Sequence, residues 1–258
     1  MTRSSVVLEK RNGVARIVLT RPKAGNAVDA AMALDLRDAC RAVVEDDGTT
    51  VAVITGAGRC FCAGGPEPSG LGAGTGLTPQ AMAERRVADA IAAIPKPTIA
   101  AINGDALGQG LEIALACDLR VAVEGARLGL GHVPNGAIPW DGGTQRLPRA
   151  VPRGVALEMI LTGKTIDAGE ALRVGLVTQV IAPEAFEAKV NELAEKLAAS
   201  APIAGRYAKE AIHHGMDLPL DHALRLEADL AVLLHTSSDR AEGIRAFLEK
   251  RPPRFTGT

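Results

Sequence analysis

The chain has 258 residues, a length that suits one large domain or a domain with a small appendage. Its formal net charge of −1 offers no electrostatic footprint for nucleic acid or for an anionic membrane, and no apolar run approaches the roughly 18 residues of a membrane span. Aromatic residues make up only 2%, so Ala, Val, Leu and Ile must fill the core and Trp140 is the sole tryptophan. We therefore expect a globular protein with neither nucleic acid nor membrane as a partner.

The N-terminus and the cysteines indicate a cytoplasmic protein. The first residues, MTRSSVVLEKRNG, lack the apolar stretch of a signal peptide. Cys60 and Cys62 form a C-x-C pair, which matches neither a redox C-x-x-C motif nor a zinc-ribbon spacing. We expect these two, with Cys40 and Cys117, to be free thiols, and we expect no metal site.

The first part of the chain alternates strands and helices. Residues 6–10 and 14–20 predict strands joined by a turn at Asn12-Gly13, and residues 29–45 carry apolar residues at helical spacing with Asp29 as the N-cap. Residues 51–55 predict a buried strand, and the Gly- and Pro-rich stretch 56–77 predicts a functional loop.

The middle and end of the chain become progressively helical. We predict a helix over 78–94, strands over 97–102 and 118–123, a helix from the Gly-rich bend 106–110 to Cys117, a second loop over 129–143, a short strand over 177–181, and helices over 155–161, 168–174, 185–199, 203–214, 221–234 and 240–249. This order predicts an α/β fold with a helix-dominated second half.

Two segments share one design, in which an apolar strand enters a Gly-rich bend. They are VAVITGAGRCFCAGG (51–65) and TIAAINGDALGQGLEIALACD (98–118). Such bends leave backbone N–H groups unpaired by the sheet, and a helix N-terminus adds its positive dipole end. Either segment alone reads as an ordinary turn. Together, two converging N–H groups predict a site that binds a developing oxyanion.

Six motifs follow one another along nearly the whole chain. They are RPKAGNAV (21–28), ITGAGRCFCAGG (54–65), AAINGDALGQGLEIALACD (100–118), GGTQRLPR (142–149), LTGKTIDAGEALRVGLV (161–177) and FLEKR (247–251). With these motifs the chain resembles the crotonase superfamily, that is, the enoyl-CoA hydratase/isomerase family. The resemblance implies a spiral of β-β-α turns over residues 1–200, a C-terminal helical region over 201–258 for trimerisation and for covering the active site, acyl-CoA as substrate with no separate cofactor, and a homotrimer or a dimer of trimers.

The resemblance assigns the oxyanion hole to the backbone N–H groups of Gly65 and Gln109. The family usually has Gly where Gln109 stands, but either residue supplies an N–H. Pro66 stands where the family typically has Asp, which reshapes the loop over the thioester end. The residues that the resemblance places along the coenzyme A path are Lys23, Ala24, Ala27 and Ala63.

The first acid/base group is Glu112, three residues after Gln109 and therefore on the same helix face. It matches the first of two glutamates that family hydratases direct at one water. Burying a carboxylate in the apolar helix LEIALA costs several kcal/mol of stability unless it is hydrogen-bonded or paired, so an unpaired one indicates a functional role. The alternative is a carboxylate held by the helix dipole.

His132 occupies the position of the second glutamate, within GLGHVPNGAIPWDGG (129–143). A histidine can act as general acid or base near neutral pH, and Asp141 could orient its ring. Alternatively, His132 caps a loop and Asp141 caps a helix that starts near Gly142. Trp140 either roofs the acyl pocket or packs in the core.

The His-x8-Asp spacing also resembles the cyclic β-diketone hydrolases of the 6-oxocamphor hydrolase type, where a His–Asp pair activates water for C–C cleavage. The leading prediction is an enoyl-CoA hydratase or isomerase that stabilises a thioester enolate. The alternatives are a hydrolase that cleaves a cyclic β-diketone or a β-keto acyl-CoA through His132–Asp141, and a non-catalytic CoA-binding paralogue. The buried carboxylate of Glu112 argues against the last.

Overall fold

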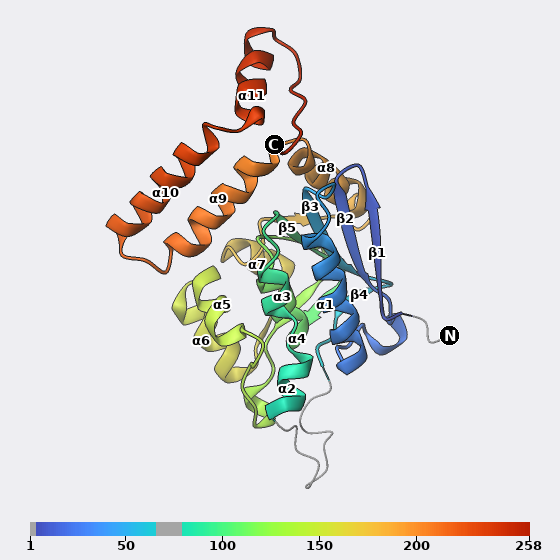
Figure 1. Ribbon diagram of the computed structural model, residues 1–258. Coiled ribbons are helices and arrows are strands. Elements are labelled where there is room, and N and C mark those ends of the chain that lie inside the picture. The colour runs from blue at the N-terminus through green and yellow to red at the C-terminus, as the bar shows by residue number, and fades with distance from the viewer. Residues whose placement is uncertain (1–3, 66–78) are drawn as a thin grey trace.

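The computed structural model describes residues 4–65 and 79–258, and this part of the chain forms two β-sheets with helices around them (Figure 1). Pro66 and most of the loop predicted over 56–77 lie outside the described residues. The larger sheet has the strand order β1-β2-β3-β5-β7-β10 and the smaller sheet has the order β4-β6-β8-β9. The strands are β1 (Val6–Arg11), β2 (Val14–Leu19), β3 (Val51–Gly56), β4 (Cys60–Cys62), β5 (Thr98–Ile102), β6 (Asp105–Leu107), β7 (Leu119–Val123), β8 (Arg127–Gly129), β9 (Thr165–Asp167) and β10 (Gln179–Ile181).

From β3 to β8, successive strands of the chain belong alternately to the larger and the smaller sheet. β3 is followed by β4, β5 by β6, and β7 by β8, so that each pair puts one strand in each sheet before the next helix. Within the larger sheet only the β1–β2 pair is antiparallel. This repeated β-β-α path confirms the predicted spiral. The sequence analysis missed the smaller sheet, because its strands have only three residues each and such strands show no alternation.

Local sequence signals explain the first elements. Asn12 and Gly13 both have positive φ angles, 50° and 78°, which is the backbone of the tight turn that joins two antiparallel strands. The helix α1 (Ala30–Val44) begins where predicted, because the Asp29 carboxylate accepts the N–H of Met32 at 2.9 Å.

The helix predicted over 78–94 is wrong in one respect, since it is two helices, α2 (Pro79–Arg85) and α3 (Ala88–Ala92). The N–H groups of Val87 and Ala88 donate to the carboxylate of Asp141, at 2.9 and 3.2 Å. A carboxylate at that place starts a new helix, because the first N–H groups of a helix need an acceptor outside it.

The later helices follow the predicted order, and Figure 1 shows α9, α10 and α11 projecting from the body of the molecule. None of the helices in the described residues is long and apolar enough to cross a membrane. The remaining helices are α4 (Gln109–Leu115), α5 (Gly143–Ala150), α6 (Arg153–Thr162), α7 (Ala168–Arg173), α8 (Phe186–Ala198), α9 (Pro202–Gly215), α10 (Leu220–Leu234) and α11 (Ser238–Leu248), with short 3₁₀ turns at Pro22–Ala24 and Val133–Asn135.

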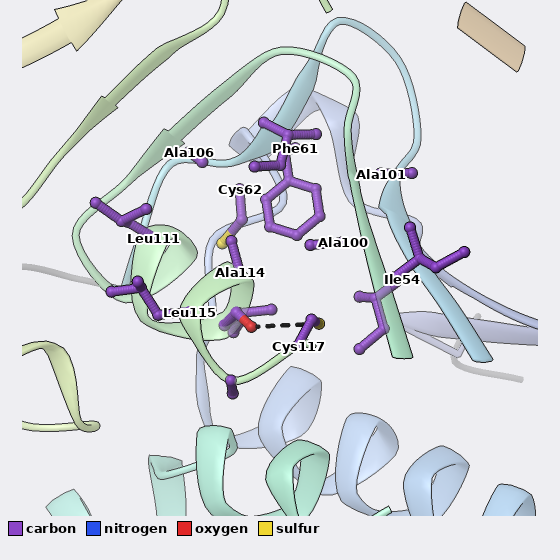
Figure 2. Packing of buried hydrophobic residues seen from close by; sticks show 14 of the residues in the cluster. Ile54, Phe61, Cys62, Ala100, Ala101, Ala106, Leu111, Ala114, Leu115 and Cys117 are labelled. Carbon is purple, nitrogen blue, oxygen red and sulfur yellow. Dashed lines mark hydrogen bonds between the residues drawn. The ribbon is translucent and has the colours of Figure 1, made fainter. Parts of the chain in front are cut away.

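The core beneath the bends packs alanine and larger aliphatic side chains around one aromatic ring. Figure 2 shows the ring of Phe61, which is fully buried, among Ala100, Ala114 and other apolar side chains of β5 and α4. Gly110 lies where α4 meets β4, and a methyl group added to it would lie 2.1 Å from the carbonyl oxygen of Cys62. The close approach of α4 to β4 therefore requires glycine at this position.

Candidate active site

The structure brings the two glycine-rich bends together. β4 pairs with β6, so the residues that follow each strand lie at the same edge of the smaller sheet. A methyl group on Gly64 would lie 3.0 Å from the carbonyl oxygen of Leu107 and 3.4 Å from the nitrogen of Gln109, and Gly64 itself has φ 101°. A side chain at this position would both strain the backbone and block the contact.

The predicted oxyanion donors lie in these bends. Gly65 follows Gly64, whose carbonyl oxygen is fixed by the N–H of Val28 at 2.8 Å. Gln109 is the first residue of α4, where a helix leaves its N–H groups without intrahelical acceptors. Within the described ranges, the backbone N–H of neither Gly65 nor Gln109 has an acceptor in the protein. The arrangement can therefore donate two hydrogen bonds to an oxyanion.

Glu112 is a buried carboxylate whose two oxygens differ in their hydrogen bonds. Its Oε1 accepts the backbone N–H groups of Asp141 and Gly143, both at 2.8 Å. Its Oε2 is buried and has no hydrogen-bond partner in the described part of the chain. Burial raises the pKa of Glu112 to about 7, and the charge of Asp141 adds to the effect, although the two N–H bonds oppose it. A carboxyl group of this kind can both take and return a proton near neutral pH.

His132 is buried next to the bend that precedes α4. A methyl group on Gly108 would lie 3.8 Å from Cε1 and 3.9 Å from Nε2 of the imidazole, so that edge of the ring faces the start of the helix. The Nδ1 atom is buried and finds no partner among residues 4–65 and 79–258. Burial lowers the pKa of His132, which keeps the ring neutral at neutral pH.

The predicted pairing of His132 with Asp141 is not formed. The Asp141 side chain is fully buried and turns toward the start of α3, where it accepts the N–H groups of Val87 and Ala88. It also accepts the Gln109 side-chain amide at 2.9 Å. The alternative prediction was that Asp141 caps the helix beginning near Gly142. It is wrong about the helix, because the carboxylate lies at the start of α3 and Gly142 caps α5 without a side-chain bond.

The Gln109 side chain is a feature that the sequence analysis did not use. It is buried, and its Nε2 donates to the carbonyl oxygen of Arg85 at 2.7 Å as well as to Asp141. Its Oε1 is the third buried side-chain atom, with Glu112 Oε2 and His132 Nδ1, that has no partner in the described residues. A methyl group on Gly65 would lie 3.0 Å from this Oε1, which places the amide beside the oxyanion bend. The signal was available, since Gln stands where the family usually has Gly.

The residues predicted along the coenzyme A path lie together beside this bend. Lys23 and Ala24 are exposed in the 3₁₀ turn Pro22–Ala24, and the N–H of Ala63 donates to the Gly25 carbonyl oxygen at 2.8 Å. Ala27 is half-buried and donates its N–H to Ala24.

Asn26, which the sequence analysis also missed, holds this segment to the smaller sheet. Its buried side-chain amide donates to the carbonyl oxygens of Ala57, Cys60 and Phe61. The Asn26 side chain therefore adds to the backbone hydrogen bonds that hold this segment beside the oxyanion bend. A positive φ of 55° at Asn26 fits the tolerance of asparagine for this conformation.

The remaining predictions concern Trp140, the cysteines and metal ligands. Trp140 is half-buried between Pro139 and Asp141. The four cysteines are free thiols, as expected. The described residues contain no group of three or more His, Cys, Asp or Glu side chains placed to hold a metal ion.

The comparisons with known proteins agree with this geometry. The family model described as enoyl-CoA hydratase/isomerase matches residues 9–258. The chain is 42% identical to (E)-benzylidenesuccinyl-CoA hydratase of Thauera aromatica, over 98% of this chain and 99% of the relative. It is 38% identical to crotonyl-CoA hydratase of Syntrophomonas wolfei, over 99% of both chains. The crystal structure of an enoyl-CoA hydratase from Bacillus anthracis superposes with a TM-score of 0.94 at 39% identity, covering 98% of this chain and 100% of that one.

The chain therefore belongs to the enoyl-CoA hydratase/isomerase family, and it is an acyl-CoA-processing enzyme of the hydratase type. This confirms the family that the sequence motifs predicted.

Proposed function

We propose that the protein adds water across the α,β double bond of an enoyl-CoA thioester. The observation that carries this proposal is the Glu112 carboxylate, with Oε1 held by two backbone N–H groups and Oε2 without a partner in the described residues. A pKa of about 7 leaves this group close to half ionised at neutral pH, which suits a group that must take and return a proton.

In the proposed reaction, Glu112 Oε2 takes a proton from a water molecule while the water oxygen bonds to Cβ. The electron pair of the double bond moves toward the thioester and forms an enolate. Its oxygen accepts the N–H groups of Gly65 and Gln109, and one such donor is worth about 3–4 kcal/mol in other enzymes. Glu112 then passes its proton to Cα, so that one water supplies both the hydrogen and the hydroxyl group.

We assign His132 to holding this water in place of a second glutamate. A neutral imidazole has one donor and one acceptor nitrogen, so it can orient a water molecule without changing the charge of the site. Its buried Nδ1 has no partner in the described residues, and its Nε2 edge lies near Gly108.

The proposed substrate is a CoA thioester, as in the names of the Thauera and Syntrophomonas relatives. We place its coenzyme A portion along Lys23, Ala24, Ala27 and Ala63, because these residues lie beside the oxyanion bend and Lys23 brings a positive charge toward phosphate groups. We place its acyl group beneath Trp140. No cofactor is needed beyond this coenzyme A.

We also propose that the C-terminal helices assemble the enzyme into a homotrimer or a dimer of trimers, with residues 1–200 as the core and 201–258 as the assembly region. Support comes from large apolar side chains that α9, α10 and α11 expose. Leu220 is 74% exposed, Val232 68% and Phe247 82%, and surfaces of this kind mark protein interfaces. Light scattering on the wild type and on Phe247→Asp tests this, and a monomeric wild type would refute it.

The four free thiols support a reducing compartment such as the cytoplasm.

The test of the reaction is turnover of crotonyl-CoA, followed by loss of the conjugated enoyl-thioester absorbance. The wild type is compared with Glu112→Gln and with Glu124→Gln, an exposed glutamate at the end of β7 that serves as the matched control. We expect Glu112→Gln to lose at least 100-fold in kcat, on the scale of general acid–base catalysis, and Glu124→Gln to match the wild type.

A wild type that binds CoA but leaves crotonyl-CoA unchanged would overturn the hydratase proposal. Assays of double-bond isomerisation would then separate an isomerase from a non-catalytic CoA-binding protein. The hydrolase alternative loses its support, because it requires the His132–Asp141 pair that the structure does not form.

A further inference from the structure

Asp141 uses every polar group it has. Its backbone N–H donates to Glu112 Oε1 at 2.8 Å, and its backbone carbonyl accepts Arg146 Nη1 at 3.0 Å. Its carboxylate accepts the N–H groups at the start of α3 and the Gln109 side-chain amide. The residue is fully buried, so these bonds are shielded from competing water.

Two of these hydrogen bonds join Asp141 to residues of the proposed active site, Gln109 and Glu112. Gln109 supplies one oxyanion N–H from its backbone, and its side-chain Nε2 lies 2.9 Å from Asp141 Oδ2. Glu112 is the proposed proton carrier, and its Oε1 is 2.8 Å from the Asp141 nitrogen. One residue therefore contacts both the group that binds the enolate oxygen and the group that moves the proton.

We propose that Asp141 is a positioning residue that fixes the oxyanion N–H of Gln109 and the carboxylate of Glu112 in one mutual geometry. It does so through the Gln109 side chain, which takes the place of the glycine usual in the family. The proposal deepens the proposed hydratase function and rests on it for its kinetic test, while its spectroscopic test stands alone. Asp141 touches neither the water nor the substrate in this scheme and has no catalytic role of its own.

The charge of Asp141 provides a readout that a purely structural role would not change. Within the described residues, the charged groups that act on Glu112 are Asp141 and Arg146 from α5, and Arg86 approaches the Asp141 carboxylate at 3.8 Å. The negative charge of Asp141 raises the pKa of Glu112 and Arg146 lowers it. Asp141→Asn removes the negative charge and keeps the shape, so the Glu112 carboxyl must ionise at lower pH.

The experiment compares the wild type, Asp141→Asn and Gln109→Leu. Leucine at position 109 keeps the backbone N–H but lacks the amide that bonds to Asp141. The Glu112 carboxyl is titrated directly, by infrared difference spectra against the matching Glu112→Gln proteins, and kcat and KM for crotonyl-CoA are measured across pH.

For Asp141→Asn we expect kcat to fall at least 10-fold while KM stays within about threefold, and the Glu112 titration and the acid limb of kcat to move together to lower pH. For Gln109→Leu we expect a similar fall in kcat, with the Glu112 titration unmoved. This second variant carries the test if Asp141→Asn does not fold.

The proposal is overturned if kcat stays within twofold of the wild type in either folded variant. It is also overturned if Asp141→Asn loses activity with the Glu112 titration unmoved, since that result marks a general defect of the fold. If the wild type does not hydrate crotonyl-CoA, the hydratase function fails. The infrared titration still decides whether Asp141 acts on Glu112, because it needs no turnover.

Discussion

Replacing Glu112 by glutamine should stabilise the protein at high pH while it removes activity. The folded protein raises the pKa of this carboxyl from 4.5 to about 7, so the folded state holds the proton more tightly than the unfolded state. Below pH 4.5 the group is protonated in both states and costs nothing. As the pH rises toward 7 the unfolded state releases its proton first, so the free energy of unfolding of the wild type falls.

The size of the effect follows from the same values. At about 1.4 kcal/mol per pH unit, the rise in pKa corresponds to about 3 kcal/mol in total, of which about 2–3 kcal/mol falls between pH 5 and pH 8. Glutamine carries no proton to release, so its free energy of unfolding should gain this amount relative to the wild type across that interval. Its Oε1 can still accept the N–H groups of Asp141 and Gly143, which limits other changes.

The assay is urea denaturation of both proteins at one fixed protein concentration, at pH 5, 6, 7 and 8. Only the difference between the two proteins is used, because titrating groups that do not interact with Glu112 contribute equally to both. Glu124→Gln serves as the control, since this side chain is exposed at the protein surface. A difference between wild type and Glu112→Gln that stays constant within about 0.5 kcal/mol would refute the reasoning and place the pKa of Glu112 near its ordinary value.

Four further substitutions have expected outcomes. His132→Ala should lower kcat for crotonyl-CoA about 100-fold, because the water loses its orientation; enoyl absorbance measures this, and unchanged kcat would remove His132 from the site. Gly110→Ala should destabilise the fold by more than about 3 kcal/mol, because its methyl group would lie 2.1 Å from the Cys62 carbonyl oxygen. Its control is Gly154→Ala in α6, which has open space around it and should be neutral or stabilising by up to about 1 kcal/mol. Urea denaturation measures the free energy of unfolding of both variants. Asp29→Ala should cost about 1 kcal/mol by loss of the α1 cap, and no loss would show that the cap bond is worth nothing here.

Much of the fold could be predicted from local patterns. The Asn12-Gly13 turn and the Asp29 cap depend on residues close in sequence, and both lie where predicted. The approach of the two glycine-rich bends was also accessible, because glycine after a buried strand permits close backbone contact. The smaller sheet was not accessible, since three residues carry too little periodicity to identify a strand.

The environment of Asp141 could not be predicted for a different reason. Its carboxylate meets the N–H groups of Val87 and Ala88, more than fifty residues earlier in the chain. From the sequence we predicted His132 or the following helix as the partner of this carboxylate, since both are near in sequence. The same long-range contact lies where the helix predicted over 78–94 is divided, so one unforeseen pair of hydrogen bonds accounts for both errors.

The burial of α4 sets limits on how this protein can evolve. All seven residues of the helix are buried, and Gly110 admits no side chain, so nearly every substitution around Glu112 carries a cost in folding. The loop over 129–143 is different, because it carries the exposed side chain of Ile138, which can change at little cost to folding. Descendants of this protein should therefore acquire new acyl preferences by changes in that loop, while the helix that carries the carboxylate is inherited almost unaltered.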